Sequence, residues 1–283
     1  MNDDRPGSRV GTAVGTAPAK LTVSLRVTGV RDDGYHLLDS VMVALDLADT
    51  LEITEAPDGR SRLEVVPDWP RGADRWRDLS VGPPADNLVT RALAAAGREA
   101  RVRLVKRIPP GAGLGGGSAD AAAVLRWAGC TDPGVAARLG ADVPFCLVGG
   151  RARVSGIGEI VEPLPFVAQS FVLLLPPFGV DTAAVYRAWD VRSSARGGRP
   201  DGAGSNGLEA AALDVEPRLA GWRKALEDAT GRTAHLAGSG STWFVEGDAS
   251  DLGVDGVGWL ELGDERAPLV ATRSTPAPGG VLR

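Results

Sequence analysis

The chain has 283 residues, a length that accommodates one large domain or two modest ones. Its hydrophobic content of 43% is ordinary for a protein with a packed core, and its net charge of −5 argues against a general nucleic-acid binder, which needs a basic face. No apolar run is long enough to cross a bilayer, the first 17 residues lack the apolar core of a signal peptide, and the two cysteines are too few for a disulfide framework. These features predict a cytoplasmic protein without nucleic-acid or membrane partners.

The first half of the chain predicts a strand-rich layer with interspersed helices. Residues 1–17, rich in Gly, Asp and Thr, are predicted to be a flexible terminus. Leu21, Val23, Leu25 and Val27 alternate with polar residues, which is the period of a half-buried strand. Further strands are expected at 41–47, 50–54, 62–66, 102–106, 145–148 and 152–154, a loop at 68–84, and helices at 88–96, 118–127 and 133–139, the first of them capped by Asp86 or Asn87.

The second half repeats this mixture. The expected strands are 171–175, 234–236, 242–245, 259–262 and 269–272, the expected helices are 182–189 and an amphipathic one around 219–229, and 192–205 reads as a flexible Arg/Gly/Ser loop. Strands and helices arrive in groups rather than in strict alternation, which favours an α+β fold in two domains over a doubly wound sheet. We expect these domains at 18–164 and 165–273, followed by a flexible tail at 274–283.

A glycine-rich segment lies between the strand at 102–106 and the helix that follows it. In residues 109–117, glycines let backbone N–H groups approach an anion closely, and the start of the helix adds free N–H groups and a positive dipole end. The segment lacks the Gly-Lys-Ser/Thr of a Walker A loop and lies too deep in the chain for a dinucleotide fingerprint. It predicts a phosphate-binding turn; the alternative is an ordinary turn that enters a helix.

The segment 109–122, Pro-Pro-Gly-Ala-Gly-Leu-Gly-Gly-Gly-Ser-Ala-Asp-Ala-Ala, resembles the ATP-binding loop of the GHMP kinase superfamily. Further blocks are similar to 4-diphosphocytidyl-2-C-methyl-D-erythritol kinases and occur in the family's order across most of the chain. These blocks are 17–21, 32–36, 86–88, 140–144 and 238–241.

This resemblance implies an activity and a fold. Such kinases use ATP and Mg²⁺ to phosphorylate the 2-hydroxyl of a cytidine-diphosphate-linked methylerythritol in the non-mevalonate route to isoprenoid precursors. The implied fold pairs an N-terminal ribosomal-protein-S5-like α/β domain with a C-terminal ferredoxin-like domain, with both ligands in the cleft between them. The expected partner is therefore the small cytidyl substrate, bound by a monomer or a homodimer.

Two residues match the family's catalytic positions. Asp142 is expected to act as general base, because a carboxylate beside the acceptor hydroxyl can take its proton as attack begins. Lys20, one of three lysines in the chain, is expected to orient Asp142 and to neutralise charge on the transferring group. Without the other blocks, Asp142 would read as a turn residue before Val-Pro and Lys20 as a surface residue.

Other residues match the binding positions of the family. Tyr35 offers a stacking face and His36 a hydrogen bond for the cytosine ring, and both tyrosines of the chain match this base site; the alternative for Tyr186 is ordinary packing in the core or on the surface. The expected substrate-binding set is Thr22, Tyr35, His36, Thr182, Tyr186, Gly238 and Ser239. The expected ATP-binding set is Lys106, Pro109, Pro110, Gly111, Ala112, Gly113, Leu114, Gly115, Gly116, Gly117, Ser118 and Ala119.

Within the ATP set, two side chains have alternative interpretations. Lys106 faces either ATP or solvent at the end of its strand. Ser118 is expected at the helix start, where its hydroxyl can cap the helix or contact phosphate or Mg²⁺. The second histidine, His235, is interpreted as a structural strand residue.

The chain departs from the family pattern at three places. Thr22 stands where the family usually has Asn, the segment 123–140 is shorter than usual, and Ala119 replaces a common Ser. These departures leave two alternatives open. One is a GHMP kinase for another small alcohol, such as mevalonate, homoserine or a sugar; the other is a non-catalytic nucleotide-binding protein.

Overall fold

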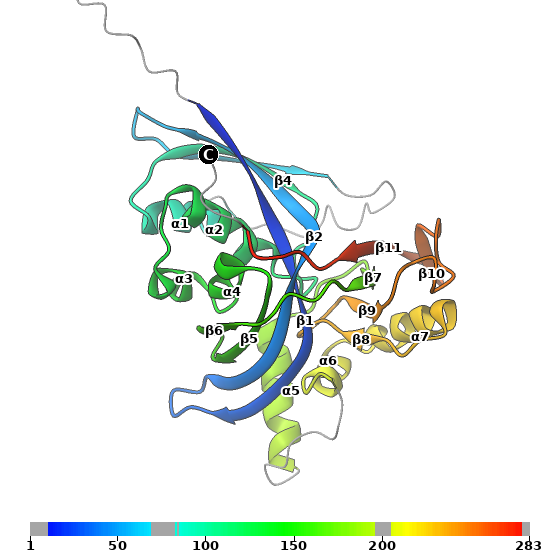
Figure 1. Ribbon diagram of the computed structural model, residues 1–283. Helices are drawn as coiled ribbons and strands as arrows, with labels where there is room; N and C mark the ends of the chain where they lie inside the picture. Colours follow the sequence, from blue (N-terminus) through cyan, green and yellow to red (C-terminus); the bar gives the residue numbers. More distant parts are fainter. Residues whose placement is uncertain (1–10, 69–82, 84, 196–204, 279–283) are drawn as a thin grey trace, which may run out of the picture.

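The computed structural model describes residues 11–68, 83, 85–195 and 205–278. The expectations for 1–10, for most of the 68–84 loop, for 196–204 and for 279–283 lie outside the described residues. Two long antiparallel strands, β1 (Thr12–Val30) and β2 (His36–Glu55), form a hairpin that crosses the molecule (Figure 1). A tight turn joins Val30 at the end of β1 to His36 at the start of β2. It is closed by a hydrogen bond from the Arg31 N–H to the Tyr35 carbonyl.

The hairpin is the centre of the first sheet. The edge of β2 opposite β1 pairs with β4 (Ala100–Lys106) along its C-terminal part and with β5 (Arg151–Gly156) along its N-terminal part. The outer strands are β3 (Arg62–Pro67), parallel to β4, and β6 (Ile160–Pro163), antiparallel to β5. The expected strands at 41–47 and 50–54 are thus one continuous element, since β2 runs through both.

Four helices cover one side of this sheet (Figure 1). They are α1 (Leu88–Ala95), α2 (Gly116–Trp127), α3 (Pro133–Leu139) and α4 (Val143–Val148). Side-chain oxygens cap two of these helices. Asn87 accepts the Val89 N–H, as expected, and Asp132 accepts the Gly134 N–H. The Ala-rich α2 is almost wholly buried, since small side chains let it lie close to the sheet and its neighbouring helices.

The second sheet has the strand order β10-β11-β7-β9-β8 and is antiparallel throughout. Its strands are β7 (Ser170–Leu174), β8 (His235–Leu236), β9 (Trp243–Glu246), β10 (Trp259–Leu262) and β11 (Glu265–Arg273). The helices α5 (Thr182–Ala195), α6 (Glu209–Val215) and α7 (Arg218–Thr230) lie between β7 and β8 in the chain. The order β11-β7-β9-β8 is that of a ferredoxin-like unit, with turns and β10 in place of the second helix.

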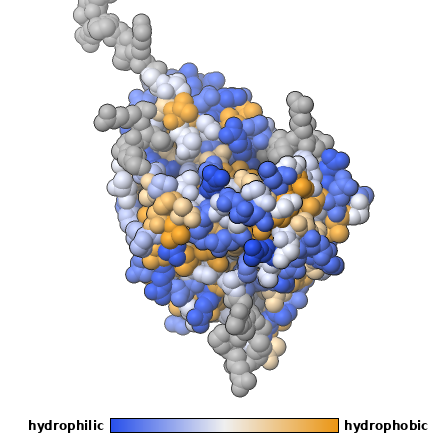
Figure 2. Space-filling view, turned by 45° about the vertical axis from the view of Figure 1, so that its right-hand side comes forward, coloured by the Kyte–Doolittle hydropathy of each residue, from blue (hydrophilic) through white to orange (hydrophobic). Residues whose placement is uncertain are grey.

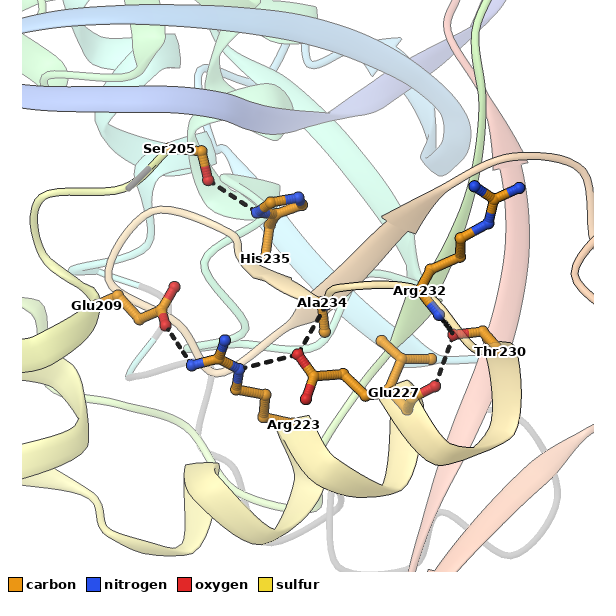
Figure 3. Close-up of polar contacts among 9 residues, drawn as sticks. Ser205, Glu209, Arg223, Glu227, Thr230, Arg232, Ala234 and His235 are labelled. Atoms are coloured by element: carbon orange, nitrogen blue, oxygen red, sulfur yellow. Dashed lines mark hydrogen bonds and ion pairs between the residues drawn. The ribbon is translucent and has the colours of Figure 1, made fainter. Parts of the chain in front are cut away.

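An ion-pair network fixes α7 against its neighbours (Figure 3). Arg223 of α7 donates to Glu209 of α6 at 2.9 Å and to Glu227 at 3.1 Å, and Glu227 also accepts the Ala234 N–H just before β8. Burial raises the pKa of Glu209. His235 of β8 lies beside this network, with Nδ1 2.8 Å from the Ser205 hydroxyl, which agrees with its expected structural role.

A third hydrophobic cluster joins the two sheets. It combines residues of the hairpin with residues of the glycine segment and of the second sheet, so one packed interface positions all three. Its buried members are Ala19, Leu21, Val43, Leu45, Ile108, Ala112, Leu114, Phe171, Leu173, Leu175, Ala237 and Phe244. The expected domain boundary near residue 164 falls between β6 of the first sheet and β7 of the second.

The structure corrects four local expectations. Residues 192–195, expected in the flexible loop, form the last turn of α5. Residues 12–17, expected in the flexible terminus, belong to β1, because they pair with 49–54 of β2 and Ala17 is buried. Residues 145–148, expected as a strand, form most of α4, which begins at Val143 with Pro144 in its first turn. The start of the expected flexible tail is anchored, since Thr275 donates to the Ala44 carbonyl and the chain returns toward the first sheet (Figure 1).

The surface in Figure 2 carries hydrophobic residues in small patches among hydrophilic ones. In the part of the chain that the structure describes, no helix has the length and apolar character needed to cross a membrane.

Candidate active site

A cleft of about 980 Å³ lies between the two sheets and gathers the predicted residues. One side is formed by the β1–β2 hairpin, the glycine turn and the residues just before α4; the other is formed by α5 and the loop between β8 and β9. All predicted site residues line this cleft except Ala119, which is buried in the core of the first half. Ala119 is therefore a packing residue, because the fourth residue of α2 already points away from the turn.

The glycine turn is shaped by three glycines with positive φ. Gly111, Gly113 and Gly115 have φ angles of 71°, 76° and 66°. A Cβ on Gly113 would lie 2.5 Å from the Ala237 carbonyl oxygen, and a Cβ on Gly115 would lie 2.7 Å from Lys20 Cγ. These two glycines therefore let the turn approach the β8–β9 loop on one side and the lysine stem on the other.

The turn ends at the N-terminus of α2, which points into the cleft. Gly115 occupies the N-cap position in the left-handed region and offers no side chain, so the first N–H groups of α2 have no side-chain cap. Ser118 lines the cleft but lies in the third helical position, because the helix starts at Gly116. Of its two expected roles, its hydroxyl therefore does not fill that of helix cap. An uncapped helix N-terminus is a favourable position for phosphate oxygens.

Lys20 and Asp142 meet beside this turn. Lys20 of β1 is 6% exposed, and its Nζ lies 3.3 Å from Asp142 Oδ2 and 3.2 Å from the Thr22 hydroxyl oxygen. Asp142 precedes α4, where its carboxylate makes no capping hydrogen bond, and its side chain is 32% exposed to the cleft. The structure thus brings Lys20, Asp142 and the glycine turn together, as the expected role of Lys20 in orienting Asp142 requires.

Lys106, the last residue of β4, is buried rather than solvated at a strand end. Its Nζ donates to Asp49 of β2 and, at 2.7 Å, to Asp120 of α2. Burial alone would lower the pKa of Lys106, but the two carboxylates raise it, so the ammonium stays charged. Lys106 lines the cleft beneath the turn, with a double ion pair behind it.

An aromatic cluster forms the far end of the cleft. The Tyr35 side chain, 59% exposed, extends from the β1–β2 turn, whereas His36 stacks on Tyr186 of α5 with ring centroids 4.6 Å apart. Burial, with a smaller contribution from Asp142, raises the pKa of Tyr186. His36 Nε2 lies 2.7 Å from Asp190 Oδ1, one turn further along α5. Tyr186 is thus both a packing residue and a wall of the cleft.

The loop between β8 and β9 completes the cleft opposite the glycine turn. Asp181 caps α5 by accepting the Ala183 and Ala184 N–H groups, and this places Thr182 with its hydroxyl oxygen 2.8 Å from that of Ser239. The buried Asn206 donates to the Leu236 and Gly238 carbonyls, so it holds the loop in place.

Sequence reasoning missed three residues that support this cleft. Asp49 is one of two acids, with Asp46, in the otherwise largely apolar run 41–51, and an acid in such a setting is a signal that could have been used. Asp120 stands inside the glycine motif but had no role assigned, and Asp190 follows Tyr186 at helical spacing.

Comparisons with known proteins agree with this geometry. Residues 87–150 match the GHMP kinases N terminal domain. A 4-diphosphocytidyl-2-C-methyl-D-erythritol kinase of Paracoccus denitrificans is 42% identical over 242 residues, which span 81% of this chain and 84% of that protein. The corresponding protein of Pelotomaculum thermopropionicum is 40% identical over 259 residues, spanning 81% of this chain and 86% of the relative.

A solved structure extends the likeness to three dimensions. The crystal structure of a 4-(cytidine 5'-diphospho)-2C-methyl-D-erythritol kinase matches with a TM-score of 0.66 at 32% identity, covering 93% of this chain and 99% of the other. Sequence identity and fold therefore agree over most of the length of both proteins. The chain belongs to the 4-diphosphocytidyl-2-C-methyl-D-erythritol kinase family and has the two-part GHMP kinase fold.

Proposed function

We propose that the protein transfers the γ-phosphoryl group of ATP to the 2-hydroxyl of 4-diphosphocytidyl-2-C-methyl-D-erythritol, with Asp142 and Lys20 as its catalytic residues. The observation that carries this proposal is the Lys20–Asp142 pair, 3.3 Å apart, beside the glycine turn and inside one cleft. A pair with this geometry suits phosphoryl transfer, in which positioning and charge stabilisation supply most of the catalysis.

In this proposal Asp142 takes the proton of the acceptor hydroxyl while the oxygen of that hydroxyl forms a bond to the γ-phosphorus. The bond from that phosphorus to the bridging oxygen breaks, and ADP leaves. Lys20 Nζ can donate hydrogen bonds both to Asp142 and to an equatorial phosphoryl oxygen. Its hydrogen bond to the Thr22 hydroxyl orients the ammonium group. Thr22 thereby supplies a hydroxyl contact at the position where the family usually has Asn.

The phosphates of ATP would lie at the glycine turn and the uncapped start of α2. Backbone N–H groups there suit a polyanion, and Gly113 and Gly115 leave room for it between Lys20 and the β8–β9 loop. Mg²⁺ is normally held by substrate phosphates and one or two protein oxygens, and the Ser118 hydroxyl, which caps nothing, fits that need. When bound, Mg²⁺ neutralises charge on the phosphates.

The cytidine end of the substrate would lie at the aromatic cluster. Tyr35 extends its ring from the turn and Tyr186 lines the cleft from α5, so either ring offers a face on which a base can stack, with His36 available to hydrogen-bond it. Thr182, Ser239 and Gly238 lie between this cluster and Lys20 and would contact the middle of the substrate. The free cysteines, Cys130 and Cys146, suit a reducing compartment such as the cytoplasm.

Purified protein with ATP, Mg²⁺ and the diphosphocytidyl substrate tests the proposal through ADP release. A parallel reaction with methylerythritol phosphate, which lacks cytidine, tests the base site, and mevalonate and homoserine test the alternative acceptors. We expect turnover of the cytidyl substrate alone. Equal turnover without cytidine would favour a kinase for another alcohol, whereas ATP binding without turnover of any alcohol would favour a non-catalytic protein.

A further inference from the structure

One cation among the described residues of the cleft has no close carboxylate partner. The basic side chains that line the cleft are Lys20, Lys106 and Arg187. Lys20 and Lys106 are buried against carboxylates. Arg187 of α5, by contrast, has a side chain that is 69% exposed, and its ion pair with Asp181 spans 3.9 Å. An exposed ion pair of this length contributes little to stability, so the Arg187 guanidinium is free to bind another anion.

The Arg187 side chain extends over the first turn of α5. Side chains of an α-helix point back toward its N-terminus, so Arg187 shares a face with Ala183, four residues earlier. The contact between Arg187 Nη2 and Asp181 Oδ2 agrees with this direction, because Asp181 caps the start of the helix. Ala183 also lines the cleft, and its methyl group is too small to cover the guanidinium. The guanidinium therefore meets the cleft at the start of α5.

The start of α5 lies between the proposed base site and the proposed catalytic pair. Tyr186, the residue before Arg187, belongs to the aromatic end of the cleft. Thr182, the first residue of α5, contacts the β8–β9 loop through its hydroxyl. In that loop, a Cβ on Gly238 would lie 3.5 Å from Lys20 Nζ. A ligand that reaches from the base site to Lys20 must therefore pass the start of α5.

The substrate of the proposed reaction is anionic along this middle part. A diphosphate, which is ionised at neutral pH, joins its cytidine to its methylerythritol. The N–H groups of Ala183 and Ala184 at the start of α5 are not available to it, because Asp181 accepts both. The planar fork of an arginine matches phosphate oxygens and can donate to two of them at once. Arg187 is thus the side chain placed to hold the diphosphate.

We propose that Arg187 binds the diphosphate bridge of the cytidyl substrate, and that the enzyme thereby selects an acceptor that carries a nucleoside diphosphate. Arg187 exchanges its loose contact with Asp181 for hydrogen bonds to the phosphate oxygens. The base is then held at one end of the cleft and the acceptor hydroxyl at the other. This inference rests on the proposed function, because it takes the cytidyl compound as the substrate.

Calorimetric titrations of cytidine and of CDP measure what the diphosphate adds to binding. Saturating ADP and Mg²⁺ are present in both titrations, so that CDP does not bind at the glycine turn. We expect the wild type to bind CDP at least about tenfold more tightly than cytidine. Arg187→Gln should raise the Kd for CDP about tenfold, the scale of one charge-assisted hydrogen bond, and leave the Kd for cytidine within about twofold. Arg187→Lys, which keeps the charge without the fork, should have a Kd for CDP between these two.

Arg192→Gln is the matched control, because Arg192 lies on the same helix, pairs with Asp214 and is not among the residues that line the cleft. It should bind both ligands as the wild type does. The inference is overturned if Arg187→Gln changes the two Kd values by the same factor, or if the wild type binds CDP and cytidine equally well. A wild type that binds neither ligand overturns it together with the proposed function. The expected affinities without turnover of the diphosphocytidyl substrate would support the role of Arg187 and overturn only the proposed reaction.

Discussion

Gly113 is the residue whose substitution tests the packing of the cleft most sharply. Its φ of 76° costs an L-residue about 1–2 kcal/mol. A Cβ would also lie 2.5 Å from the Ala237 carbonyl oxygen and 2.6 Å from that of Gly240, both backbone atoms that cannot rotate away. Such overpacking adds about 1–3 kcal/mol, so Gly113→Ala should lower the free energy of unfolding by about 2–5 kcal/mol.

Gly97 offers a matched control for this substitution. It has a φ of 62° and nothing within 4 Å of a built Cβ, so Gly97→Ala should cost only the backbone strain of about 1–2 kcal/mol. Urea unfolding measures both variants, and KM for ATP should rise in Gly113→Ala alone, because the turn must separate from the β8–β9 loop. If the two variants lose equal stability and keep the KM of the wild type, the close contact between the turns is refuted.

Three further predictions concern the base site and the buried ion pairs of Lys106. Tyr35→Ala should raise KM for the cytidyl substrate about tenfold with little change in kcat, since one stacking face is lost; an unchanged KM in steady-state assays would remove Tyr35 from the site. Asp190→Ala should also raise this KM, because His36 loses the partner 2.7 Å from its Nε2, and it should leave KM for ATP unaltered. Burial raises the pKa of Asp120 from 3.8 to about 7. Between these pH values the folded state therefore binds more protons than the unfolded state, and the free energy of unfolding falls as pH rises, by up to about 1.4 kcal/mol per pH unit. Urea titrations between about pH 5 and pH 7 should show this fall in the wild type relative to Asp120→Asn, and parallel curves would contradict the assignment.

Local patterns predicted the parts of the fold that depend on neighbouring residues. The alternation of apolar and polar residues predicted the part of β1 from Leu21 to Val27, and Asn87 caps α1 where a side-chain oxygen was expected. The glycine turn could also be predicted, because glycines before a helix readily adopt the positive φ angles of a tight turn. In each case the determining contact lies within a few residues in the chain.

The sequence was insufficient where a distant partner decides the conformation. Residues 12–17 are extended because they pair with 49–54, and nothing in their own composition shows it. Thr275 is held by Ala44, more than two hundred residues away in the chain. The role of Lys106 likewise depends on Asp49 and Asp120, and only the folded sheet shows that the lysine is buried between them.

The most direct test of the proposed chemistry is kcat of Asp142→Asn with ATP, Mg²⁺ and the diphosphocytidyl substrate. The amide keeps the shape of the side chain beside Lys20 but cannot take the hydroxyl proton. We predict that kcat falls by about 10²–10⁴-fold, the usual range for a general base, while the Kd for ADP stays within about twofold of the wild type. A kcat within about tenfold of the wild type would contradict the assignment of Asp142 as the base.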